Sequence, residues 1–157
     1  MLLAGRCAAQ PPDPERIALT IEALSRLNKD QIYANPKLKA ALDRVLEATQ
    51  GTHQFVELVR QFDVKDQTVA LVETAIKNPD SSFAADALRI ALDGNGLATI
   101  QKRLQGTNVT ESINLINVLG NVAEKRTVPL VEPVVRDSTR DVALRKRAVR
   151  SLVQTRE

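Results

Sequence analysis

The sequence predicts an all-α fold, an α-solenoid of stacked antiparallel helix pairs with about nine helices. Apolar residues recur along the chain at the three- and four-residue spacing of amphipathic helix faces. Gly, Pro and Asn residues interrupt this pattern at intervals that suit single helices joined by short turns. No segment shows strand-like alternation. Aromatic residues make up only 3% of the 157 residues and tryptophan is absent, so aliphatic side chains must fill the core.

The first two helices are predicted from their caps and apolar faces. Asp13 suits the N-cap of the first helix and Pro14 its first turn. Asn35-Pro36 opens the second helix, and Gly51 supplies a left-handed stop. The apolar face of the first helix is formed by Ile17, Ile21, Leu24 and Leu27, and that of the second by Leu38, Leu42, Val45 and Leu46.

Four helices are predicted in the middle of the chain. The residues Asn78-Pro79 end one of them, and Asp80 or Ser81 caps the next. The segment Asp93-Gly94-Asn95-Gly96 is a turn between helices. The predicted ranges are 52–62, 66–77, 81–92 and 97–104.

The last third of the chain, residues 110–157, predicts one helical hairpin and the first helix of the next. The hairpin has apolar stripes on both sides of a short Lys125-Arg126 turn. Ser138 and Asp141 have the spacing of a capping box, and a third helix follows from Asp141. Its apolar residues are Leu144, Ala148, Val149, Leu152 and Val153, and we expect them to pack on the preceding helix.

This last helix repeats the first helix of the hairpin. When Ala148 is aligned with Leu115, the same shift places Val149 on Ile116 and Leu152 on Leu119. A weaker copy lies upstream, where a slightly smaller shift places Ala87 on Leu115 and Leu88 on Ile116. Loops of unequal length account for the difference between the two shifts. A helix pair that repeats in this way predicts a stacked array.

The residues Val128-Pro129-Leu130-Val131, Val135, Asp137, Leu144-Arg145 and Ala148 resemble a HEAT repeat. In that motif a proline lies early in one helix, an aspartate ends it, and an arginine enters the next helix. The resemblance is good over residues 111–152, loose over 54–105 and absent before Gly51. It supports the fold and says little about function, because the fold serves many functions.

A second resemblance rests on Phe55–Arg60, on Gly120-Asn121 with Glu124-Lys125, and on Ala148–Glu157. These segments are similar to the HEAT portion of exported planctomycete-type haem-binding proteins. There the repeats resemble a spacer between a dehydrogenase-like propeller and a cytochrome c domain. The resemblance implies that this chain is a fragment. The chain lacks a C-x-x-C-H motif, so any haem belongs to a downstream domain and no cofactor is assigned here.

Residues 1–10 are interpreted as the remnant of a secretory signal or as a disordered start, and residues 11–157 as the solenoid. Cys7 and Ala9 are the small residues that a cleavage site before Gln10 requires, although the apolar core before them is short. Lipid anchoring at Cys7 is disfavoured because Arg6 precedes it. We expect an exported or periplasmic protein, or otherwise a cytoplasmic one, with no membrane span.

The sequence predicts no enzyme and assigns no catalytic, cofactor or metal residue. His53, the only histidine, lies one turn before Glu57, but a structural zinc site needs four ligands and a catalytic site three. Gly94 and Gly96 follow a helix, whereas a phosphate-binding glycine motif follows a strand. The carboxylates Glu22, Glu47, Glu57 and Glu73 are scattered along solvated faces.

Positive charge is concentrated at the end of the chain. Residues 136–157 hold seven basic and three acidic side chains, +4, whereas the remaining residues hold 15 and 16, −1. The candidate contacts for an anionic partner are Arg145, Lys146, Arg147 and Arg150. The alternative is a solvated helix face on which Arg145 pairs with an aspartate, as between HEAT repeats.

The sequence therefore favours a non-enzymatic interaction or scaffolding module that binds a protein partner or flanking domains of the same polypeptide. The alternative is a nucleic-acid-binding HEAT-like protein that uses the basic last helix, and a third hypothesis is a role in electron transfer. Nucleic acid is disfavoured because the basic residues occupy one end only. We also expect self-association through the C-terminal helix, because its apolar residues have nothing to cover one side.

Overall fold

A computed structural model describes residues 13–155. Over this range the chain forms ten α-helices and one short 3₁₀ turn, with no β-strand. The helical class is therefore confirmed, and the expected number of about nine helices was one too low. The chain divides into two compact units, residues 1–48 and 49–157. We describe each by itself.

The first unit contains three helices. The Asp13 carboxylate accepts a hydrogen bond from the Glu15 amide (3.1 Å), as predicted for the cap of the first helix. That helix ends at Ser25, so Leu27 lies beyond it. The three helices are α1 (Pro14–Ser25), α2 (Lys29–Ala34) and α3 (Pro36–Thr49).

Helix α2 was missed by the sequence prediction. It has six residues, and Ile32 is its only buried one, so it shows no apolar periodicity. A reciprocal capping box holds its start: the Asn28 side chain accepts from the Gln31 amide, and the Gln31 side chain accepts from the Asn28 amide, both at 2.9 Å. Such a box satisfies two amides that the first turn leaves without partners.

The second unit contains the remaining seven α-helices and the 3₁₀ turn η1. Gly51, just before its first helix, has φ of 84°, which confirms the left-handed stop. The elements are α4 (His53–Gln61), α5 (Thr68–Lys77), α6 (Ser82–Asp93), α7 (Leu97–Leu104), α8 (Val109–Val122), η1 (Lys125–Thr127), α9 (Val128–Arg136) and α10 (Val142–Gln154).

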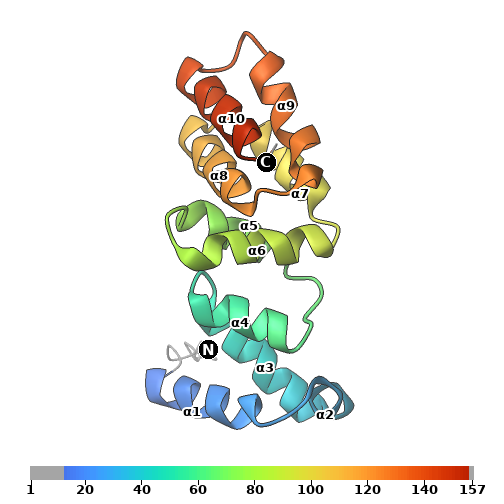
Figure 1. Ribbon diagram of the computed structural model, residues 1–157. Coiled ribbons are helices and arrows are strands. Elements are labelled where there is room, and N and C mark those ends of the chain that lie inside the picture. Colours follow the sequence, from blue (N-terminus) through green and yellow to red (C-terminus); the bar gives the residue numbers. More distant parts are fainter. Residues whose placement is uncertain (1–12, 156–157) are drawn as a thin grey trace, which may run out of the picture. The chain divides into compact units, whose positions relative to one another are not determined.

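The helices of the second unit pack in two series. Helices α4, α6, α8 and α10 contact one another in that order, and α5, α7 and α9 do the same. Contacts of α5 with α6, of α7 with α8 and of α9 with α10 join the two series. Figure 1 shows this order from the green α5 and α6 to the orange and red α9 and α10. This packing is consistent with a helical repeat.

Helix α8 packs against four other helices of the unit, α5, α6, α7 and α10. Leu115, Ile116 and Leu119 have no exposed surface. Gly120 allows the close approach of α10: a Cβ atom at Gly120 would lie 3.2 Å from the Ser151 Oγ and 3.4 Å from the Ser151 Cα. Contacts this short require the neighbouring side chain to move.

Two predictions for the last helix were wrong. Asp141 itself caps α10 by accepting hydrogen bonds from the Ala143 amide (2.8 Å) and the Leu144 amide (3.1 Å), so Ser138 forms no capping box with it. Its packed face also differs from the predicted one. Val149 and Val153 are exposed, whereas the buried residues of the helix and its C-cap are Leu144, Ala148, Ser151 and Thr155.

Small polar residues explain the second error. Ser151 is 2% exposed and Thr155 6% exposed, and both are buried positions that an apolar pattern does not register.

Among the described residues, none of the helices has the length and hydrophobicity that crossing a lipid bilayer requires.

Candidate interaction surface

The sequences of the four helices α4, α6, α8 and α10 can be aligned in one register, in which most buried residues of α4, α6 and α8 superpose. One position in this register is buried in all four helices, occupied by Leu58, Ala87, Leu115 and Ala148. The alignment of Leu58 with Ala87 also places Glu57 on Asp86 and Arg60 on Arg89.

The next position in the register distinguishes α10 from the other three helices. Val59, Leu88 and Ile116 are at most 1% exposed, but Val149 is 47% exposed. The following core position behaves in the same way, since Leu119 is buried and Leu152 is only half-buried. Helix α10 therefore has the apolar pattern of a covered helix on a face that the described residues cover only in part.

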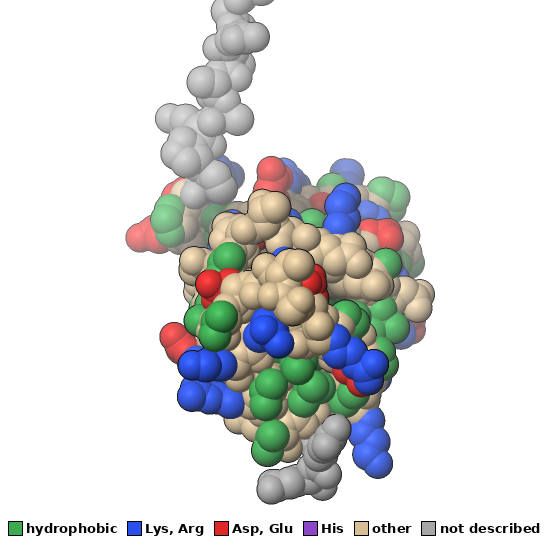
Figure 2. All heavy atoms as spheres, turned by 90° about the horizontal axis from the view of Figure 1, so that it is seen from above, with side chains coloured by type: hydrophobic (Ala, Val, Ile, Leu, Met, Phe, Trp, Pro, Cys, Tyr) green, Lys and Arg blue, Asp and Glu red, His purple; other side chains and the backbone are tan. Residues whose placement is uncertain are grey.

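The uncovered residues of α10 form a stripe. Val142, Val149 and Val153 recur at the spacing of two turns and then one turn, so they lie on one side of the helix. Val142 is 60% exposed and Val153 61% exposed. Figure 2, which looks onto the end where α9 and α10 lie in Figure 1, shows hydrophobic side chains gathered between Lys and Arg side chains. We call Val142, Val149, Val153 and the half-buried Leu152 the valine stripe.

The basic residues before and at the start of α10 hold the fold together. Arg140 donates from Nη1 to the Gly106 carbonyl (3.1 Å) and from Nη2 to the Leu104 carbonyl. These carbonyls lie at and beyond the end of α7, where the helix itself leaves acceptors unsatisfied. Arg140 thus ties the loop before α10 to α7.

The expected pairing of Arg145 with an aspartate is not the contact observed. The Arg145 Nε donates to the Val135 carbonyl at 3.2 Å. Asp137 is instead paired with Arg140, with Nε and Oδ2 3.7 Å apart. Hydrogen bonds from the Thr139 hydroxyl and amide lower the pKa of the Asp137 carboxyl, with a smaller contribution from Arg140 and Arg145. Arg145 is therefore a structural residue of the α9–α10 connection.

Three of the four candidate contacts for an anionic partner are available for binding. Lys146, Arg147 and Arg150 are exposed, which confirms that they lie on solvated faces. No described residue forms an ion pair or hydrogen bond with their side chains. By helical spacing, Lys146 and Arg150 flank the valine stripe on one side, and Arg147 lies further round the helix. Arg156 lies outside the described residues.

Elsewhere in this series of helices, arginines pair with acids on their own helix and at the next one in the series. Arg60 on α4 contacts Asp86 on α6, with Nη2 and Oδ2 2.9 Å apart. Arg89 on α6 contacts Asp86 at 3.0 Å and approaches Glu124, beyond the end of α8, at 3.5 Å. The hydrogen bond from Arg60 is the largest cause of the lowered pKa of the Asp86 carboxyl, and Arg89 adds to it. We call this chain of contacts the arginine ladder.

Beyond α6, the acidic and basic positions of the arginine ladder are occupied by other residue types. In the shared register the Asp86 position is Asn114 on α8 and Arg147 on α10, and the Arg89 position is Asn117 and then Arg150. Asn114 donates to the Ile76 carbonyl (3.0 Å), and the buried Asn117 Oδ1 has no hydrogen-bond partner. Helix α10 therefore has a positively charged residue at both of these register positions, where α4 and α6 have one acidic and one basic residue.

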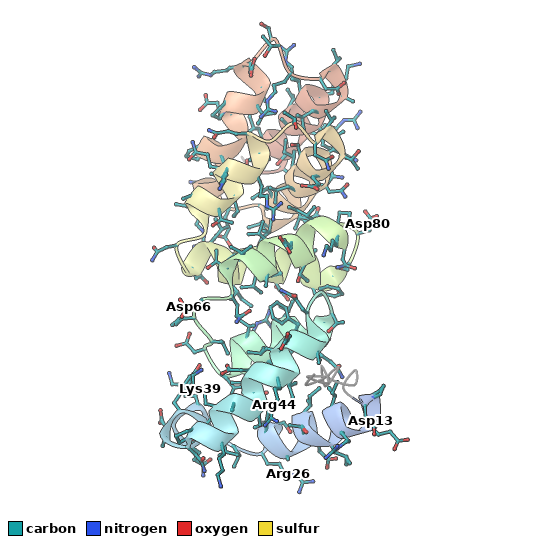
Figure 3. The ribbon with its side chains drawn as sticks, turned by 180° about the vertical axis from the view of Figure 1, so that it is seen from behind. Asp13, Arg26, Lys39, Arg44, Asp66 and Asp80 are labelled. Atoms are coloured by element: carbon teal, nitrogen blue, oxygen red, sulfur yellow. The ribbon has the colours of Figure 1, made fainter. Side chains whose placement is uncertain are left out.

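Among the described residues, the cavities of the structure are not lined by a set of side chains typical of a catalytic site. One, with a volume of about 530 Å³, lies between the ends of α4 and α6 and the start of α5, lined by Asp63, Asp66, Lys65 and Arg60 among others. Another of about 400 Å³ lies between α1 and α3, with Arg16 and Arg44 on its wall. Figure 3 shows that Asp66 and Asp80 project from separate loops of the second unit.

The residues considered for metal and phosphate binding lie at ordinary positions. His53 is the first residue of α4, 3.6 Å from Glu57 through Nε2, and its ring lies 5.8 Å from the Phe83 ring. Gly94 and Gly96 join α6 to α7, which confirms a turn between helices. Within residues 13–155, no three His, Cys, Asp or Glu side chains cluster so that they could hold a metal ion.

Sequence reasoning identified the basic residues of this surface and expected uncovered apolar surface on the last helix, but it did not identify which residues form the valine stripe, and it missed the arginine ladder. A signal for the ladder was present in the sequence, since Glu57-x-x-Arg60 recurs as Asp86-x-x-Arg89. No signal in the sequence showed which apolar residues stay uncovered, because exposed and buried valines look alike in a helical pattern. Comparison of the chain with protein-family models, with curated proteins and with solved structures finds no match.

Proposed function

We propose that this chain is a non-enzymatic protein-interaction or scaffolding module, built as a HEAT-like α-solenoid, and that the outer face of α10 is its binding surface. The observation that carries the proposal is the exposure of Val149 at a register position that is buried in α4, α6 and α8. Aliphatic residues grouped on one face and flanked by charged residues are typical of protein-binding surfaces. Export, and membership of a larger haem-binding protein, stay predictions from the sequence.

The test uses a helical peptide with leucines at i, i+3, i+4 and i+7 and glutamine at the flanking positions, because this uncharged probe reports the apolar contact alone. We expect the full chain to bind it in a fluorescence anisotropy titration. Replacing Val149 and Val153 by aspartate should weaken binding about tenfold or more, since each buried aliphatic side chain contributes about 1.5 kcal/mol or more.

The matched control is Val69→Asp on α5, because Val69 is 55% exposed and α5 packs mainly against α6, α7 and α8. This substitution should leave peptide binding unchanged. Absence of binding by any peptide, or equal weakening in the control, would contradict the proposal.

A second candidate function is nucleic-acid binding, which the exposure of Lys146, Arg147 and Arg150 favours. Neutralising a few phosphates supplies only weak, salt-sensitive affinity. We therefore rank it below protein binding, and a DNA duplex is included as a competing ligand below.

A further inference from the structure

We infer that the partner of the α10 surface is an acidic amphipathic helix, which docks along the valine stripe as the next member of the series α4, α6, α8 and α10. This inference rests on the proposed function and adds the chemistry of the partner. It follows from two features, the shared register and the arginine ladder.

The register defines what the surface receives. Helix α10 packs on α8, and it meets the side of α8 that carries Gly120, where a Cβ atom would lie 3.2 Å from the Ser151 Oγ. In the shared register Ile116 corresponds to Val149, Leu119 to Leu152 and Gly120 to Val153. The valine stripe is therefore the counterpart of the α8 face that receives a helix, and a helix is the shape it fits.

The arginine ladder defines the charge of that helix. Arg60 occupies the register position of Arg150, and its partner is Asp86 on the next helix. An incoming helix with an acid at the Asp86 position would therefore place it beside Arg150. Arg147 and Lys146 add two further exposed positive charges to the same helix. Complementary charge favours an acidic occupant and disfavours a basic one.

A second copy of α10 fits this surface poorly. Two such helices would bring Lys146, Arg147 and Arg150 of each copy together, and like charges repel.

The experiment compares three helical peptides that share the same leucine positions and carry Glu, Gln or Lys at the flanking positions. We expect the full chain to bind the Glu peptide about tenfold more tightly than the Lys peptide at low salt, and expect the difference to shrink as salt is added. The double substitution Arg147→Glu with Arg150→Glu should reverse the order.

The matched control is Lys102→Glu with Lys125→Glu, which changes the net charge by the same amount on α7 and η1, where both lysines are exposed. It should leave the preference for the Glu peptide in place. Helical circular dichroism of each variant verifies that the fold is retained.

The outcomes separate this inference from the proposed function. Equal binding of all three peptides would overturn the acidic partner and leave the protein-binding surface intact, whereas no peptide binding would overturn both. Tight binding of a DNA duplex that is lost in the Arg147→Glu, Arg150→Glu variant, without peptide binding, would assign the surface to nucleic acid. Dimerisation in light scattering that Val149→Asp abolishes and that blocks the Glu peptide would assign it to a second copy.

Discussion

Helices α8 and α10 occupy equivalent positions in one register, but they have different surroundings. Helix α8 packs against α5, α6, α7 and α10, whereas the main neighbours of α10 among the described helices are α8 and α9. Each has an aliphatic residue at the same register position, Ile116 with no exposed surface and Val149 with about half of its surface exposed. The comparison teaches that the same pattern stabilises the fold where a neighbour covers it and leaves an apolar surface exposed where none does.

The largest expected difference between the two helices is in the free energy of unfolding. Ile116→Ala should destabilise the second unit by about 2–5 kcal/mol, because it removes buried methyl groups and leaves a cavity. Val149→Ala should change stability by about 0.5 kcal/mol or less, as for an exposed position. Urea denaturation followed by circular dichroism measures both. Equal destabilisation would mean that Val149 is buried in solution.

The arginines at this end of the chain sharpen the same comparison between structural and available residues. Arg140→Ala should destabilise the chain by about 1–3 kcal/mol, because it removes charge-assisted hydrogen bonds to the carbonyls of Leu104 and Gly106. Arg147→Ala should have almost no effect, since the exposed Arg147 side chain has no partner among the described residues. The same urea titrations test this, and a large effect of Arg147→Ala would contradict it.

The bounds of most helices could be predicted from the sequence. The residues of each helix explain why α7 was predicted and α2 was not. Helix α7 begins and ends as expected, at Leu97 and Leu104, because glycine turns enclose a short apolar pattern. Helix α2 escaped because a single buried isoleucine cannot show a period. A helix that short is set by its cap and by tertiary packing.

The candidate site was predicted only in part, for a different reason. Exposure of Lys146, Arg147 and Arg150 follows from the helical pattern, because strongly charged residues avoid the core. Which of the apolar residues of α10 lie in the interface depends on the neighbouring helix, and that interface includes Ser151 and Thr155. The partner of Arg145 likewise depended on the path of the loop from residue 137 to residue 141.

The smallest expected effect is the pH dependence of the arginine ladder. Hydrogen bonding to Arg60 lowers the pKa of Asp86 in the folded chain, so its contribution to stability is fully present above the unfolded pKa of about 3.9 and is lost as the pH falls through the lower folded-state pKa. Asp86→Asn should destabilise the chain at pH 7 by about 0.2–1 kcal/mol, the range for exposed pairs.

The difference in unfolding free energy between the native chain and Asp86→Asn should shrink as the pH is lowered below about 4. Arg150→Gln serves as the control, because Arg150 has no ion pair among the described residues. It should show no such pH dependence. A constant difference between pH 7 and pH 3 for Asp86→Asn would contradict the assignment of the pair.

Thiol labelling at equivalent positions of α8 and α10 tests the central claim most directly. Cys7 is the only cysteine, so replacing it by serine leaves a single thiol in each of the variants Ile116→Cys and Val149→Cys. The cysteine at position 149 should react at close to the rate of an exposed thiol. The cysteine at position 116 should react at least about a hundredfold more slowly, because its thiol is accessible only when the structure opens locally. Adding the Glu peptide should slow labelling at position 149 alone. Slow labelling of both cysteines without peptide, or no protection of position 149 by the peptide, would contradict an uncovered docking face on α10.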